Sequence, residues 1–202
     1  VFQDAALLNR ITVFHYAGHA TANKLFFENA DGTSESADAF GLLPLLATAD
    51  SLQLVFFNGC LTSKMAVALN NRGVPAVIGT VSRVKDTLSM ELAQAFYQRL
   101  ANGLPLDKIW QQSTAAIQAR IGEDDYRDYY KEESVRGDVP LGVKEDRLPW
   151  EIYYREGAED VKYWNLPSAA GQPLFGLPDI QKQYDLPNVP YRLMSAYTQD
   201  DA

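Results

Sequence analysis

The segments "VFHYAGHA", residues 13–20, and "VFFNGC", residues 55–60, are short apolar runs that each end at or beside a chemically reactive residue. His19 stands near the end of the first run, and Cys60, the only cysteine in the chain, ends the second. Apolar runs of this length predict buried β-strands. They raise the question of whether the fold brings His19 and Cys60 together.

Strand and helix patterns alternate around these two runs. The expected strands are 11–16, 24–28, 52–57 and 74–79, and the expected helices are 37–47, 63–71, 86–102 and 106–121. This alternation predicts an α/β/α sandwich, with a mainly parallel sheet and helices on both faces. Ligands of such sheets bind at the carboxyl ends of the strands, and both reactive residues are expected there.

The composition changes after residue 121. Residues 122–149 are rich in charge and tyrosine without a clear period, which predicts an exposed loop. Residues 150–166 predict a terminal β-hairpin at the sheet edge, and the repeated prolines of 167–202 predict a linker. The chain enters a core-like strand soon after Val1, so we expect part of the domain to precede it.

Bulk properties limit the class of protein. With 202 residues, 47% of them hydrophobic, the chain can bury one sizeable core, predicted to lie within a domain of residues 1–166. A net charge of -8 without a basic stretch argues against nucleic acid as a partner. The apolar runs are too short to span a membrane. A single cysteine fits a reducing, cytoplasmic compartment, and no pattern implies a metal or cofactor.

The chemistry depends on the histidine and the cysteine. A cysteine attacks a carbonyl as the thiolate, which requires a neighbouring base, a helix amino terminus, or both. A helix that begins near Ser63 would direct its positive end at Cys60, and His19 on a neighbouring strand could take the thiol proton.

Small residues surround the pair. Gly18 and Ala20 flank the histidine and Gly59 precedes the cysteine, so a substrate main chain can approach closely. The main-chain N–H groups of Ala20 and Cys60 are candidates for an oxyanion hole. From residue types alone, a buried cysteine and a hydrogen-bonded structural histidine are the stronger interpretation.

The order of the motifs resembles a known family. The chain is similar over residues 11–121 to the CHAT family of caspase-like cysteine peptidases, on "HYAGHA" (15–20), the small residue and cysteine at 59–60, "GVPAVIGTVSRVKD" (73–86) and "ELAQAFYQRLANGLPL" (91–106). The resemblance implies that His19 and Cys60 form a catalytic dyad. His15 matches the family's first motif position, but its strand parity favours a core histidine.

Two departures from the family concern specificity. The chain reads "NGCLTS" where members commonly carry Ser-Ala-Cys-Glu-Thr, and Ser82 where they carry tryptophan. The segment after "IGT" lines the S1 pocket in relatives such as separase, where an acidic residue receives a P1 arginine. The resemblance therefore implies that Ser82 and Asp86 bind substrate. An N-cap role for Asp86 in the helix 86–102 is the alternative.

Two classes of function follow, a caspase-like endopeptidase acting on a protein or peptide substrate and a catalytically silent interaction module. The end of the chain, "PYRLMSAYTQDDA" (190–202), resembles the lead-in to STAND-type NTPases. That resemblance implies a downstream sensor NTPase domain, or an oligomer, in a bacterial defence protein. Ordinary linker composition is the alternative.

Overall fold

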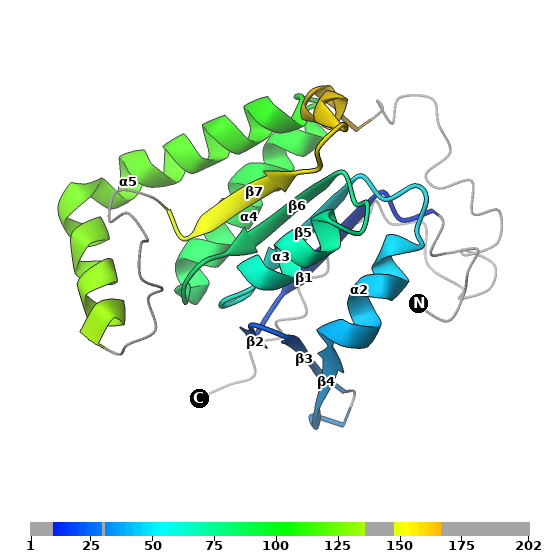
Figure 1. The fold of residues 1–202 in the computed structure, drawn as a ribbon. Helices are drawn as coiled ribbons and strands as arrows, with labels where there is room; N and C mark the ends of the chain where they lie inside the picture. The colour runs from blue at the N-terminus through cyan, green and yellow to red at the C-terminus, as the bar shows by residue number, and fades with distance from the viewer. Residues whose placement is uncertain (1–9, 30, 136–147, 167–202) are drawn as a thin grey trace, which may run out of the picture. The chain divides into compact units, whose positions relative to one another are not determined.

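The computed structural model describes residues 10–29, 31–135 and 148–166, with side chains for all of these except 122–135. Within these ranges, the main sheet has four strands in the order β1 (Val13–Ala17), β5 (Leu54–Asn58), β6 (Ala76–Thr80) and β7 (Trp150–Tyr154). β1, β5 and β6 are parallel, and β7 is antiparallel to β6. The predicted α/β fold with a mainly parallel sheet is confirmed (Figure 1).

Helices cover both faces of this sheet. α2 (Ala39–Ala47) and α3 (Ser63–Asn70) pack on one face, and α4 (Asp86–Ala101) and α5 (Leu106–Val135) on the other (Figure 1). Side chains of a strand alternate between the faces, so Phe56 packs against Phe96 of α4 while Phe57 joins the core under α2 and α3. β5 is buried on both faces, which is why its sequence is a continuous apolar run.

A small antiparallel sheet follows β1. It contains β2 (Ala20–Thr21), β3 (Lys24–Glu28) and β4 (Ser34–Asp38). The sequence pattern predicts β3 but not β4, and the predicted start of the next helix, residue 37, is two residues too early. The helix α2 begins only at Ala39, because the Asp38 carboxylate caps it by accepting a hydrogen bond from the Phe40 N–H at 2.8 Å.

The prediction of a loop from residue 122 is wrong for residues 122–135. These residues continue α5, which runs for 30 residues. The segment lacks an apolar period, but between Gly122 and Gly137 it has neither glycine nor proline and is rich in helix-forming Glu, Arg and Lys. The rest of the predicted loop up to Arg147 lies outside the described residues. Among the described helices, none is both long and apolar enough to cross a membrane.

The terminal hairpin is also corrected. Only its first half is a strand, β7, and Val161 lies in a 3-10 helix, η1 (Glu159–Tyr163). Val161 is buried with the α4 and α5 core, and the carbonyl of Trp164 accepts the N–H of Leu106 at 2.8 Å. These residues therefore satisfy the amino-terminal end of α5 instead of pairing with β7. The predicted linker, including 190–202, lies outside the described residues.

Candidate catalytic site

β1 and β5 end side by side. Their parallel register finishes with Ala17 opposite Asn58. His19 lies two residues beyond the end of β1, and Cys60 lies two residues beyond the end of β5. The two reactive residues therefore follow neighbouring strands at the same edge of the sheet, as the sequence predicted.

The turns that carry the two residues touch at Gly59. A Cβ atom at Gly59 would lie 2.7 Å from the Gly18 carbonyl oxygen and 2.9 Å from the Ala20 Cβ. Side chains do not fit at such distances, so glycine is required where the turns meet. The residues on both sides of His19 are therefore packed against the residue that precedes Cys60.

Both side chains are within reach of a ligand. His19 is exposed, and the thiol of Cys60 is partly buried. Across the described residues, neither side chain makes a hydrogen bond, to the other or to a third group. Hydrogen bonds between catalytic groups are often long in free enzymes and shorten when substrate binds, so this geometry does not exclude a catalytic pair.

The turn after Cys60 is strained. Leu61 has a φ of 59°, the left-handed region that side-chain-bearing residues avoid at a cost of about 1–2 kcal/mol. Its N–H donates to the Ser82 carbonyl at 3.2 Å. This conformation turns the chain sharply between β5 and α3, and Cys60 stands at the bend.

Two buried threonines, Thr62 and Thr80, hold the same turn in place through hydrogen bonds. The Thr62 hydroxyl accepts the N–H of Thr80 at 3.0 Å, and the Thr80 hydroxyl accepts the N–H of Thr62 at 3.1 Å. The Thr80 hydroxyl donates a hydrogen bond to the Gly59 carbonyl, and the Thr62 hydroxyl donates one to the Phe57 carbonyl at 3.1 Å. These reciprocal bonds fix the main chain on both sides of Cys60.

The helix after the cysteine begins where the sequence predicted. α3 starts at Ser63 with Thr62 as its N-cap, and the Thr62 side chain makes no capping bond to it. The amino terminus of α3 follows the Cys60 turn directly, and Thr62 leaves its main-chain N–H groups uncapped. The partial positive charge there favours an anion, such as a thiolate, at the turn.

The proposed oxyanion-hole amides are available. The Phe26 N–H donates to the His19 carbonyl at 3.0 Å, which makes His19 and Phe26 a hydrogen-bonded pair between the strands. The next residue, Ala20, forms a non-hydrogen-bonded pair with Leu25 of β3. Its N–H therefore points away from β3. The Cys60 N–H has no partner within the described part of the chain. Their role as an oxyanion hole stays a prediction.

His15 is half-buried and packs its ring against the core, as its strand parity indicated. Its ring stacks on Phe56 with centroids 4.9 Å apart and contacts Tyr97 at 5.2 Å. Its Nε2 is buried without a hydrogen-bond partner within the described residues. Burial lowers the pKa of His15 to about 4, so the ring is neutral at physiological pH.

We expect this histidine to make stability depend on pH. The unfolded chain takes up a proton near pH 6.5, but folded His15 resists protonation until about pH 4. The free energy of unfolding therefore decreases by about 3 kcal/mol as pH falls from 6.5 to about 4. Urea unfolding at several pH values would measure it. His15→Phe should flatten the slope and His19→Ala should not, whereas equal slopes in His15→Phe and the wild type would contradict the assignment.

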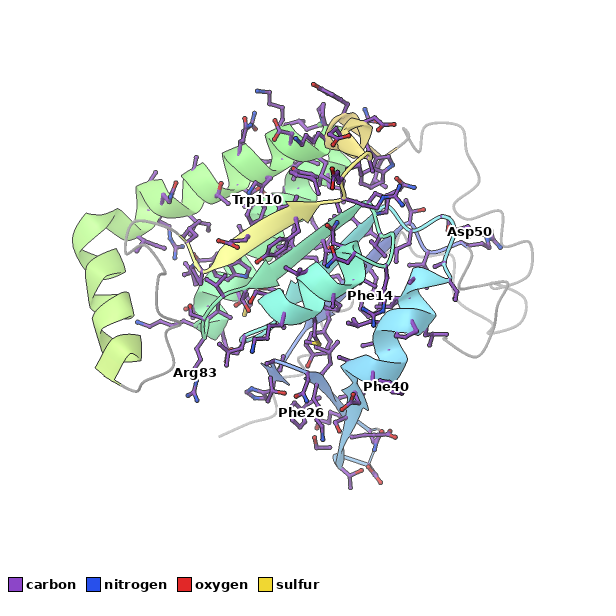
Figure 2. The ribbon with its side chains drawn as sticks, in the orientation of Figure 1. Phe14, Phe26, Phe40, Asp50, Arg83 and Trp110 are labelled. Carbon is purple, nitrogen blue, oxygen red and sulfur yellow. The ribbon has the colours of Figure 1, made fainter. Side chains whose placement is uncertain are left out.

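The predicted substrate-binding residues lie between β6 and α4. Ser82 is buried, and its hydroxyl donates to the Arg83 carbonyl at 3.2 Å, so its main chain rather than its side chain contacts the Cys60 turn. Arg83 marks this segment in Figure 2. Asp86 is exposed as the first residue of α4. The N-cap is Lys85, and no side chain caps the helix, so the alternative role of Asp86 as the N-cap is wrong.

A hollow of about 450 Å³ lies elsewhere, between α5 and β7. Trp110 and Trp150 are among its lining residues, and Trp110 is labelled in Figure 2. The Trp150 indole N–H donates to the Asn58 side chain at 2.9 Å, which links this wall to the end of β5. Within the described residues no group of His, Cys, Asp or Glu side chains could hold a metal ion.

A mainly parallel α/β sheet with a histidine and a cysteine after neighbouring strands is the arrangement of a caspase-like protein. Comparison with protein families agrees. The CHAT domain matches residues 2–167, and the chain belongs to this family of caspase-like peptidases. The match extends the resemblance seen at residues 11–121 in both directions. No curated protein matches the chain.

Proposed function

We propose that the chain is a caspase-like cysteine endopeptidase with Cys60 as nucleophile and His19 as general base and acid. The contact of the two turns at Gly59 carries the proposal, because it packs the residues on both sides of His19 against the residue before Cys60. Membership of a caspase-like peptidase family supports it.

In the proposed reaction, His19 takes the proton of the Cys60 thiol, and the thiolate attacks the scissile carbonyl. The oxyanion that forms accepts hydrogen bonds from the N–H groups of Ala20 and Cys60. The protonated His19 gives its proton to the leaving amine, and the C–N bond breaks to leave a thioester. Water, deprotonated by His19, then attacks the thioester, which releases the acid and restores the thiol.

Cleavage-site mapping tests this proposal. The protein would be incubated with a proteome-derived peptide library, and the Cys60→Ala variant would serve as the control. We expect new peptide termini with the active protein that are absent with the variant. The same termini in both samples would reject Cys60 as the nucleophile.

A catalytically silent interaction module is the second candidate. One observation favours it: within the described residues the imidazole and the thiol share no hydrogen bond. A thiol-reactive peptide electrophile separates the two candidates, because a peptidase positions such a probe at the nucleophile. Rapid, saturable labelling of Cys60 supports the endopeptidase, and labelling no faster than that of the unfolded chain supports the silent module.

Asp86 is proposed to receive a basic P1 residue. Its carboxylate is exposed at the start of α4, and the segment before it contacts the Cys60 turn through the Ser82 carbonyl. An Asp–Arg pair gains strength once a substrate covers it. Asp86→Asn is expected to lower kcat/KM for Arg or Lys substrates by about tenfold, with little effect on cleavage after neutral residues. Efficient cleavage after Asp by the wild type, or an unchanged P1 preference in the variant, would contradict this role.

The wider setting is proposed from sequence alone. The similarity of residues 190–202 to the lead-in of STAND-type NTPases supports a downstream sensor domain, and therefore a defence protein that works in the cytoplasm. The peptidase would then be the effector part. Extending the expressed chain past residue 202 tests this, since a nucleotide-binding domain should follow and should change the cleavage rate when it binds ATP.

A further inference from the structure

Tyr16 is a buried polar residue at the end of β1, only 5% exposed. Its hydroxyl donates to the His19 carbonyl and accepts the Phe26 N–H at 3.0 Å. The Phe26 carbonyl lies 2.8 Å away and competes for the same proton. The hydroxyl thus joins the main chain of His19 to β3.

The ring of Tyr16 fills the space that two glycines leave. A Cβ atom at Gly18 would lie 2.9 Å from the Tyr16 hydroxyl oxygen, and one at Gly59 would lie 3.2 Å from the Tyr16 Cε1. One ring therefore packs against the residue before His19 and against the residue before Cys60.

We propose that Tyr16 is a positioning residue for the dyad. Its hydroxyl fixes the main chain of His19, and its ring sets the spacing between the His19 and Cys60 turns. The proposal rests on the proposed peptidase function. Tyr16 touches neither the substrate nor the reacting atoms, and acts through His19 and Cys60.

The protonation of Tyr16 is consistent with this role. Burial raises the pKa of Tyr16 above its ordinary value, the hydrogen bond with Phe26 lowers it, and the charge of a Cys60 thiolate raises it. The net effect is upward, so the hydroxyl remains a hydrogen-bond donor across the neutral range.

The Tyr16→Phe substitution tests the proposal, because it removes the hydroxyl and keeps the ring. We expect kcat to fall about tenfold, equivalent to about 1.4 kcal/mol in the barrier, while KM stays within about twofold. The acid limb of the kcat/KM profile should also move, because that limb reports the ionisation of the dyad. A folded Tyr16→Phe protein with wild-type kcat and pH profile would overturn the proposal.

Tyr153→Phe is the matched control. Tyr153 lies half-buried on β7, and its hydroxyl donates to the Glu151 carboxylate at 2.7 Å, so the substitution also removes one hydroxyl hydrogen bond from a strand. We expect kcat, KM and the pH profile of this variant to match the wild type. An equal loss of kcat in both variants would show that Tyr16 has only a structural effect and would overturn the proposal.

Gly18→Ala serves if Tyr16→Phe does not fold. It keeps every hydrogen-bonding group and pushes a methyl group towards the Tyr16 hydroxyl, so the same fall in kcat is expected. Wild-type kcat in folded Gly18→Ala would overturn the proposal.

The rate of Cys60 alkylation by iodoacetamide provides a test that requires no substrate. It should be several-fold slower in Tyr16→Phe than in the wild type, and equal rates would reject the positioning role. Absence of cleavage by the wild type would instead reject the proposed function, so the two failures are distinguishable.

Discussion

Cys60→Ala and His19→Ala are each expected to lower kcat/KM for peptide cleavage by at least about 1000-fold while leaving the fold intact. The first substitution removes the nucleophile, and the second removes the base that generates the thiolate and protonates the leaving amine. His19 is exposed and Cys60 is only partly buried, so little core packing is lost in either variant.

Cleavage assays beside thermal unfolding would measure both effects. Thr21→Ala is a suitable control, because Thr21 is exposed two residues after His19 and, among the described residues, its hydroxyl donates only to the Asn23 side chain. It should retain wild-type activity and stability. Cleavage at more than about a tenth of the wild-type rate by a dyad variant would reject that residue's role.

Gly59→Ala is expected to impair both stability and activity. The added Cβ would collide with the Gly18 carbonyl and the Ala20 Cβ, which are main-chain or rigid atoms that cannot move aside cheaply. Overpacking of this kind costs about 1–3 kcal/mol of unfolding free energy. Separating the His19 turn from the Cys60 turn by up to about 1 Å would lower kcat by about 100-fold.

Gly41→Ala provides the matched glycine control. Gly41 lies in α2, and nothing is within 4 Å of a Cβ built there. Alanine favours helix more than glycine does, so this variant should be as stable as the wild type or about 1 kcal/mol more stable, with unchanged kcat. Urea unfolding and kinetics on both variants would decide the matter. If Gly59→Ala behaved like Gly41→Ala, the turns would not be in contact.

The sequence predicted most of the main sheet because burial on both faces leaves a simple pattern. β5 and β6 are entirely buried, and their apolar runs located them to within two residues. β4 has the sequence "SESAD", with no apolar alternation, and forms only because it pairs with β3. Pairing between segments cannot be recognised in the pattern of one of them, so β4 was missed.

The carboxyl-terminal part was predicted less well for related reasons. Residues 122–135 were assigned to a loop because they lack an apolar period, yet helix propensity without a breaker continues α5. Residues near Val161 have strand-like composition, but they fold as η1 because the core beside α5 offers a site for Val161. Local helix propensity decides the first difference, and tertiary packing decides the second.

The candidate site was predictable in its reactive residues but not in its supports. His19 and Cys60 follow predicted strands, and parallel strands end at a common edge, so their placement followed from the topology. Tyr16, Thr62 and Thr80 act through hydrogen bonds between different elements, which no spacing in the sequence encodes. Tyr16 and Thr80 stand out only as hydroxyl-bearing residues in mostly apolar strands, and Thr62 has no such signal.

The most direct test of the account is the rate at which iodoacetamide alkylates Cys60 in the folded wild type and in His19→Ala at about pH 6.5. Cys60 is the only cysteine in the chain, so the readout has no background from other thiols. If His19 takes the thiol proton, the wild type should react at least about tenfold faster than the variant, and the peptide electrophile should show the same difference. Equal rates in the two folded proteins would show that His19 and Cys60 do not form a dyad.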